Sequence, residues 1–311
     1  MARPLRFQEH PWQPVELTMR CRQSRFLLRP GEEANARVLG VIGRALHVFA
    51  GRARIYFGGA TSNHIHLLAA FESAEARGQF KAHVKANISK EIGRLHDWPG
   101  GIWQGRGHDI PVLDDEAFID RLMYLAAHGV KEGLAFCPHS WPGIQWVRAV
   151  TEGKPLTGVW YDRTMLCGLT RAWSVLPLAD RGRRPSLGDV AERLPVELTP
   201  PPMWAHLSPS EQRTRWQALV GDALERYPAA AHPQGADAVR RADPHTRPAQ
   251  TKKSRAPRVH TRQAALRQAW FAAYGAFVDA YRAAMNALRA GEAGVCFPTE
   301  GCRPVCFWAS G

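Results

Sequence analysis

The segment from Asn63 to Leu68 alternates histidine with large apolar residues, a pattern that favours one backbone conformation. Side chains of a β-strand point to alternate faces, so a strand here places His64 and His66 on one face and Ile65 on the other. Two imidazoles on one face of a rigid strand can share a divalent ion. The pair alone leaves two other readings open: hydrogen-bonded histidines without metal, and a metal-dependent amidohydrolase with His-x-His at the end of a barrel strand.

A second informative segment begins at Asp114, a residue type that commonly caps the N-terminus of a helix. At the helical period, one arc of the following segment is apolar: Phe118, Ile119, Leu122, Leu125, Ala126, Gly129 and Val130. The opposite arc is polar: Asp120, Tyr124, His128 and Lys131. Tyr124 and His128, four residues apart, are therefore expected side by side and outside the apolar stripe.

The periodicity of the first half predicts alternating strands and helices. Strands are expected at residues 15–21, 52–59, 63–70 and within 102–113, and helices at 33–49, 73–95 and from 114 onward. This order predicts an α+β fold with a ferredoxin-like, split βαβ antiparallel sheet.

Four blocks of the chain resemble the REP-associated tyrosine transposases, the IS200-like group of single-tyrosine HUH transposases. The blocks are Val15-Glu16-Leu17-Thr18-Met19-Arg20, Asn63-His64-Ile65-His66-Leu67-Leu68, Ile102-Trp103-Gln104-Gly105-Arg106-Gly107-His108-Asp109, and Tyr124 through Leu134. The family motifs similar to the last three are Asn-His-Val-His-Leu-Leu, Leu-Trp-Gln-Arg-Arg-Tyr-His-Asp and Tyr-Ile-x-x-Asn-Pro-Val-Arg-Ala-Gly-Leu. Two departures are Thr61-Ser62 for Met-Pro and His128-Gly129 for Asn-Pro.

This resemblance implies the HUH endonuclease fold, with His64 and His66 on a central strand. It implies a transposase that nicks single-stranded or hairpin DNA and transfers strands through a 5′-phosphotyrosine on Tyr124. The implied metal ligands are His64, His66 and His128, and the implied cofactor is Mg²⁺ or Mn²⁺. His128 puts an imidazole in place of an amide ligand; imidazole is a good ligand for transition metals and a poorer one for magnesium, so the resemblance leaves the choice of metal open.

The net charge agrees with a nucleic-acid partner: the chain has 41 Lys and Arg residues but only 28 Asp and Glu residues, which gives a formal charge of +13. The excess is densest between Arg240 and Arg267, where nine basic residues accompany one acid, Asp243. Prolines interrupt this run, so its first part is expected to be an extended arm that contacts phosphates. The predicted DNA-binding residues are Arg240, Arg241, Arg247, Lys252, Lys253, Arg255, Arg258 and Arg262.

Two domains are predicted: residues 1–150 as the nuclease domain, and 151–311 as a mostly helical extension that binds DNA through the basic arm at 240–267. Within the extension, helices are expected from Ser208 to about Tyr227 and over 261–290, with a proline-bearing basic linker over 228–260 between them. The core stripe expected for the second helix is Leu266, Trp270, Ala273, Phe277, Tyr281, Ala284 and Leu288.

The six cysteines are scattered and the first residues lack an apolar signal-peptide core. We therefore expect a cytoplasmic bacterial protein at the nucleoid, without membrane contact, as a monomer or homodimer. Two alternatives to the transposase remain. One is an HUH-fold protein that binds hairpin DNA but cleaves it weakly or not at all. The other is an amidohydrolase, which residues 151–311 disfavour because they lack strand–helix alternation.

Overall fold

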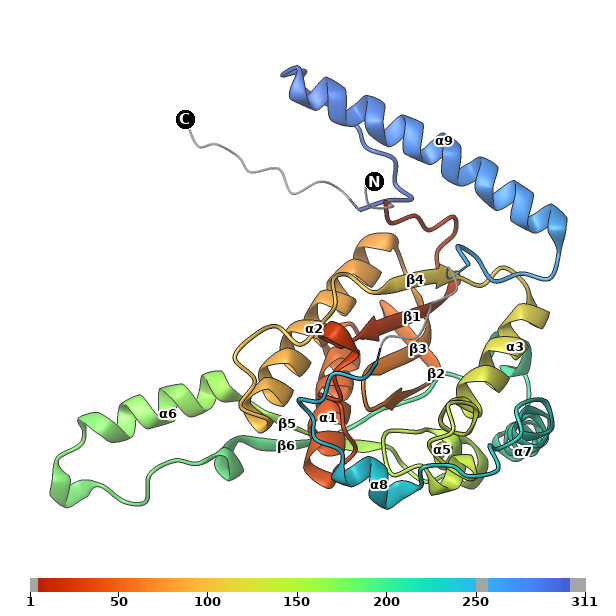
Figure 1. The fold of residues 1–311 in the computed structure, drawn as a ribbon. Coiled ribbons are helices and arrows are strands. Elements are labelled where there is room, and N and C mark those ends of the chain that lie inside the picture. The colour runs from red at the N-terminus through yellow and green to blue at the C-terminus, as the bar shows by residue number, and fades with distance from the viewer. Residues whose placement is uncertain (1–4, 250–256, 303–311) are drawn as a thin grey trace.

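The computed structural model describes residues 5–249 and 257–302 and centres on a four-stranded antiparallel sheet (Figure 1). Its strands are β1 (Pro14–Arg20), β2 (Ala53–Thr61), β3 (His64–Phe71) and β4 (His108–Pro111). They lie in the order β2-β3-β1-β4. This is the strand order of a split βαβ sheet, so the predicted fold class is confirmed, and the histidine strand β3 is central.

Helices cover both faces of the sheet (Figure 1). On one face lie α1 (Glu32–Val48) and α2 (Ala74–Leu95). Phe71 of β3 and Phe80 of α2 mark this face, with ring centroids 5.3 Å apart. On the other face lies α3 (Asp115–Ala126), followed by the short α4 (His128–Lys131). All eight residues of β3 are buried, as expected of a central strand with helices on both sides.

The local sequence explains where these helices begin. Ser73 caps α2 by accepting a hydrogen bond from the backbone N–H of Ala76, and Asp114 caps α3 in the same way through Ala117. The structure breaks the predicted tyrosine helix between Ala126 and His128, although the backbone N–H of Lys131 still donates to the carbonyl of Ala127. The break leaves Tyr124 and His128 close together.

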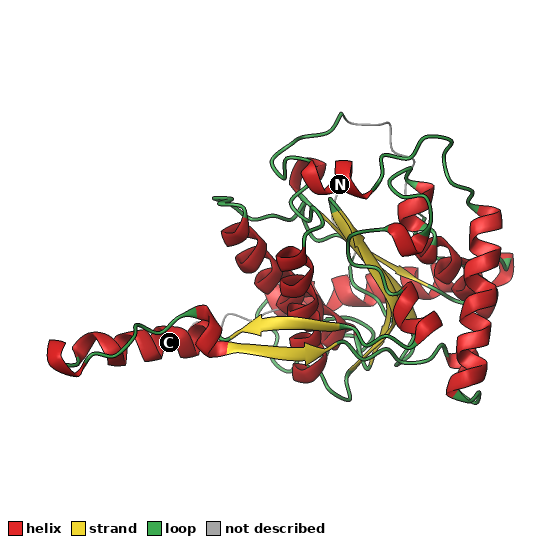
Figure 2. Cartoon of the chain, turned by 90° about the horizontal axis from the view of Figure 1, so that it is seen from below, coloured by secondary structure: helices red, strands yellow, loops and turns green. Residues whose placement is uncertain are grey.

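The second half adds a hairpin and further helices. The hairpin strands β5 (Thr157–Tyr161) and β6 (Ala191–Pro195) pack on α1, and α6 (Arg163–Val175) projects from them into solvent (Figure 2). The remaining helices are α5 (Val147–Glu152), α7 (Pro209–Arg226), α8 (Ala236–Arg241) and α9 (Ala264–Arg289). Short 3-10 turns occupy Arg22–Ser24, Pro138–Ser140, Leu178–Asp180, Leu187–Val190 and Pro202–Trp204.

The second half matches the predicted helices but differs from the predicted connections. Helices α7 and α9 were predicted to within a few residues, and Trp270, Phe277 and Ala284 of the expected stripe are buried. The expectation of a proline-bearing linker over 228–260 was incomplete, because α8 forms inside it. The hairpin and α6 were not predicted. The domain division at residue 150 stays a prediction; Trp216 and Leu219 of α7 join the core of the first half.

Among the described residues, no helix combines the length and apolar character needed to cross a membrane.

Candidate metal centre and tyrosine

Three histidines converge between β3 and the α3–α4 junction. The Nε2 atoms of His64 and His128 lie 2.8 Å apart. The ring centroid of His66 lies 4.8 Å from that of His64 and 4.9 Å from that of His128. One nitrogen from each ring falls within 4.8 Å of the other two, and all three residues are buried. The structure therefore brings together the three residues that the sequence predicted as metal ligands.

Polar groups on the far side of the rings orient two of these histidines. His66 Nδ1 lies 2.8 Å from the Glu16 carboxylate and 3.1 Å from the Thr18 hydroxyl. His64 Nδ1 lies 2.5 Å from Asn63 Oδ1. Since a carboxylate and an amide oxygen accept, both histidines donate from Nδ1, which leaves the Nε2 lone pairs for the centre of the cluster. Histidine ligands of metals are usually held in this way.

The chemistry of the cluster fits a divalent ion. Burial lowers the pKa of His128 well below its ordinary value, and the nearby His66 lowers it further, so His128 is neutral. Its Nδ1 is buried without a hydrogen-bond partner among the described residues. In a tetrahedral zinc site with bonds of about 2.1 Å the ligand nitrogens lie about 3.4 Å apart, so His64 and His128 would have to move apart by about half an ångström to hold such an ion. Neutral imidazoles suit zinc and the later transition metals better than magnesium.

Tyr124 lies beside the cluster. Its ring centroid is 5.2 Å from that of His128 and 6.0 Å from that of His66. The cationic groups of Arg121 and Lys131 lie 4.5 Å and 4.9 Å from the ring centroid. Burial and the negative charge of Glu16 raise the pKa of Tyr124 to about 12, while Arg121 lowers it. The chain by itself thus keeps the phenol protonated at neutral pH.

Glu16 links His66 of the cluster to two basic side chains. The sequence did not lead us to predict Glu16 as part of the site. Its carboxylate contacts His66, Arg121 at 3.5 Å and His260 at 3.0 Å. Burial raises the pKa of Glu16, but the close contacts with His260 and His66 lower it more, so the carboxyl stays ionised well below its ordinary range. The available signal was a glutamate inside the apolar strand Val15–Met19, two residues before Thr18, which pairs with His66.

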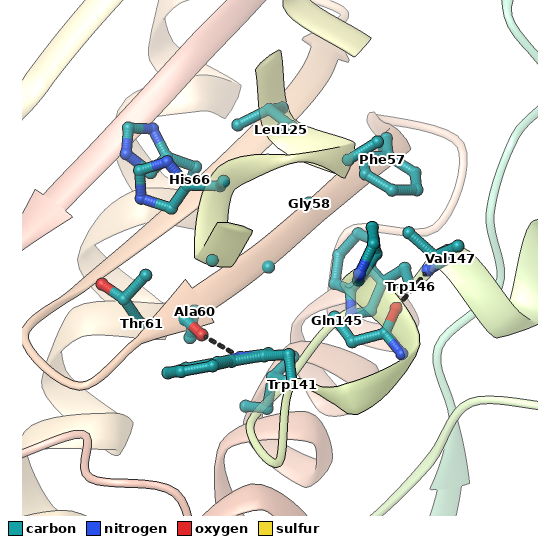
Figure 3. Close-up of a pocket in the computed structure, with 16 residues that line it drawn as sticks. Phe57, Gly58, Ala60, Thr61, His66, Leu125, Trp141, Gln145, Trp146 and Val147 are labelled. Atoms are coloured by element: carbon teal, nitrogen blue, oxygen red, sulfur yellow. Dashed lines mark hydrogen bonds between the residues drawn. The ribbon is translucent and has the colours of Figure 1, made fainter. Parts of the chain in front are cut away.

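An apolar pocket adjoins the cluster (Figure 3). His66 and His128 form one side, and Trp141 and Trp146 form the opposite wall. The indole N–H of Trp141 donates to the carbonyl of Ala60 at 3.0 Å, which fixes the ring over the end of β2. The histidines therefore lie between a wall of aromatic rings and the polar groups of β1.

Those of the predicted DNA-binding residues that the structure describes lie on different elements. Arg240 and Arg241 end α8, and Arg240 lies 3.7 Å from Asp237. Arg247 lies in the loop that follows, whereas Lys252, Lys253 and Arg255 fall outside the described residues. The two remaining arginines have internal partners: Arg258 lies over the Tyr274 ring at 4.6 Å, and Arg262 pairs with Asp120.

Comparison with solved structures gives a distant similarity. No protein-family model matches the sequence, and no curated protein matches it. Among solved structures, one described as the REP-associated tyrosine transposase bound to a REP hairpin is similar to this chain, with a TM-score of 0.38 and 16% identity. The similar region covers 49% of this chain and 86% of that one.

Proposed function

We propose that this protein is a metal-dependent enzyme that cleaves and rejoins single-stranded DNA through a covalent tyrosine intermediate. One observation carries the proposal: three buried imidazoles converge on one point with Tyr124 directly beside them. His64, His66 and His128 would hold the ion, with Mn²⁺ or Mg²⁺ as the expected cofactor. Sequence blocks resembling single-tyrosine HUH transposases support the same assignment.

In the proposed reaction the Tyr124 oxygen attacks a backbone phosphorus. The bond from phosphorus to the 3′ oxygen breaks, which leaves a 5′-phosphotyrosine and a free 3′-hydroxyl that carries the proton lost by the phenol. When bound, the divalent ion supplies Lewis acidity for the phosphate and favours ionisation of the nearby phenol. The positive charges of Arg121 and Lys131 beside the ring stabilise the phenolate as it develops.

Hairpin-forming single-stranded DNA is the proposed substrate, as in the element ends or repeats on which such enzymes act. The formal charge of +13 and the basic residues between Arg240 and Arg267 support a polyanionic partner. In this proposal residues 1–150 perform the chemistry and residues 151–311 contribute DNA contacts. The protein would act at the bacterial nucleoid in the cytoplasm, as a monomer or homodimer.

Trapping of the covalent product tests the reaction. Hairpin oligonucleotides labelled on the 3′ side of the cleavage site are incubated with Mn²⁺ and run on a denaturing protein gel. The wild-type chain should carry the label, and Tyr124→Phe should carry none. Tyr227→Phe is the matched control, because the Tyr227 ring lies 6.3 Å from that of Tyr124. A labelled adduct on Tyr124→Phe would exclude Tyr124 as the nucleophile.

Two alternatives remain, of which the same assay tests the first and the fold bears on the second. A DNA-binding protein without cleavage is favoured by the replaced Asn-Pro motif. Such a protein would bind the hairpin in a salt-sensitive way and would form no covalent protein–DNA adduct with any divalent metal. The amidohydrolase alternative needs a (β/α)₈ barrel, whereas the histidines here lie on a four-stranded antiparallel sheet.

A further inference from the structure

A short segment from the second half of the chain lies against the edge of the sheet. The backbone N–H of His260 donates to the carbonyl of Pro111 at 2.8 Å, and that of Leu113 donates to the carbonyl of His260 at 3.0 Å. These two bonds form a parallel bridge between Val112 and His260. The segment therefore continues the sheet just beyond β4, where backbone pairing fixes its register.

The same segment is attached to the start of the tyrosine helix. The Thr261 hydroxyl donates to the Asp114 carboxylate, and the backbone N–H of Arg262 donates to the same oxygen, Oδ2, at 3.1 Å. The other oxygen of Asp114 accepts the backbone N–H of Ala117 and caps α3. One carboxylate thus holds both the helix with Tyr124 and the segment with His260.

These attachments place the His260 side chain beside Glu16, next to the histidine cluster. Its Nε2 lies 3.0 Å from Oε2 of Glu16, and Oε1 of Glu16 lies 2.8 Å from Nδ1 of His66. The side chains of His260 and Glu16 are 13% and 4% exposed, so water has little access to the contact. The contact falls outside hydrogen-bond geometry, and neither His260 Nε2 nor Glu16 Oε2 has a hydrogen-bond partner among the described residues.

The geometry points to His260 as a positioning residue that acts through Glu16 on the proposed metal ligand His66. The Glu16 carboxylate lies between the two imidazoles, with Arg121 3.5 Å from the oxygen that also faces His260, so rotation of the carboxylate would break these contacts. His260 therefore holds Glu16 in the position that keeps the proton of His66 on Nδ1 and turns its Nε2 lone pair toward the cluster. The second half of the chain thereby completes the site. This inference rests on the proposed function for the role of the metal, but the orientation of His66 can be measured without metal.

Three variants of the full chain separate the side chain from the segment that carries it. His260→Ala removes the contact to Glu16, whereas His260→Gln keeps an N–H donor of similar reach. Thr261→Val removes the hydroxyl bond to Asp114 and leaves His260 unchanged. Thermal unfolding of each variant verifies that the fold is intact before any comparison.

The first readout is the tautomer of His66 in metal-free protein. Long-range ¹H–¹⁵N spectra of histidine-labelled protein identify the protonated ring nitrogen, and the His66 signals are assigned by their absence in His66→Ala. We expect the Nδ1–H form in the wild type, His260→Gln and Thr261→Val, and a mixture of tautomers in His260→Ala. A wild type without the Nδ1–H form, or His260→Ala with an unchanged spectrum, overturns the inference.

The second readout is Mn²⁺ affinity measured by calorimetry. Loss of a residue that orients a ligand typically weakens metal binding by about 10- to 100-fold, so His260→Ala should bind at least about 10-fold more weakly. His260→Gln and Thr261→Val should stay near the wild type. Equal weakening in His260→Ala and Thr261→Val would refute a specific role for His260. If the wild type binds no Mn²⁺, the proposed function fails, and the tautomer readout still decides the inference.

Discussion

Arg262 donates two parallel hydrogen bonds to the carboxylate of Asp120, from Nε to Oδ2 and from a terminal nitrogen to Oδ1, each 2.8 Å long. Asp120 lies one turn before Tyr124 on α3, and Arg226 of α7 donates to the same carboxylate at 2.6 Å. The predicted phosphate contact by Arg262 would therefore compete with a well-formed internal ion pair. In the structure Arg262 joins the second half of the chain to the tyrosine helix.

This ion pair predicts a pH-dependent contribution to stability. Burial raises the pKa of Asp120, but hydrogen bonds from Arg262 and Arg226 lower it more, so its folded value lies below the ordinary one. The stabilisation is present above about pH 4 and is lost as the pH falls through the lower folded value. The melting-temperature difference between the wild type and Asp120→Asn should therefore be largest near neutral pH and shrink in acid. Asp222→Asn, at an exposed carboxylate on α7, should show no such trend.

Two helix glycines differ in the space around them, so their substitution by alanine should have opposite effects on stability. Gly40 lies where α1 contacts the β5–β6 hairpin, and Gly275 lies on an open face of α9. A Cβ on Gly40 would lie 2.1 Å from the carbonyl oxygen of Val159, so Gly40→Ala must push the hairpin away. We expect a loss of about 1–3 kcal/mol in the free energy of unfolding. Gly275 of α9 has no neighbouring atom within 4 Å of an added Cβ, so Gly275→Ala should gain about 0.5–1 kcal/mol. Denaturant unfolding measures both, and a Gly40→Ala protein as stable as wild type would contradict this packing.

Removal of the two strand histidines should abolish metal binding. His64→Ala combined with His66→Ala removes two of the three converging imidazoles, so Mn²⁺ binding should fall below detection by calorimetry. Cleavage should stop in this variant, as it should in wild type treated with a chelator, and return only to wild type when Mn²⁺ is added. His232→Ala, at an exposed histidine, is the control. Undiminished Mn²⁺ binding in the double variant would place the site elsewhere.

The basic residues outside the described structure should contribute to DNA affinity. Removing one cation that touches a phosphate reduces the slope of log affinity against log salt by about 0.7 for single-stranded DNA and 0.9 for duplex. Lys252→Ala with Lys253→Ala should therefore flatten the slope by roughly 1.5, while cleavage at saturating DNA persists. Arg213→Ala with Arg215→Ala removes the same charge from α7 and should leave the slope unchanged. An unchanged slope in the lysine variant would mean that these lysines touch no phosphate.

The sequence was most informative where the repeat of a single strand or helix determines both the local structure and which functional side chains share a face. Strict alternation placed His64 and His66 on one face of β3, and the helical period placed Tyr124 near His128. Glu16 and His260 could not be predicted as partners, because no local period connects residues near opposite ends of the chain. The hairpin was missed for a related reason: its strands are short, and their position depends on packing against Gly40 and Gly43 of α1.

The position of His260 late in the chain also sets an order of events during protein synthesis. A ribosome elongates a chain at about 5–20 residues per second, so His260 is made on the order of ten seconds after His128. The imidazole cluster and Tyr124 can meet during that interval, but Glu16 has no His260 to hold it. A nascent or truncated chain that ends before residue 260 therefore carries the tyrosine and the three histidines without the side chain that faces Glu16.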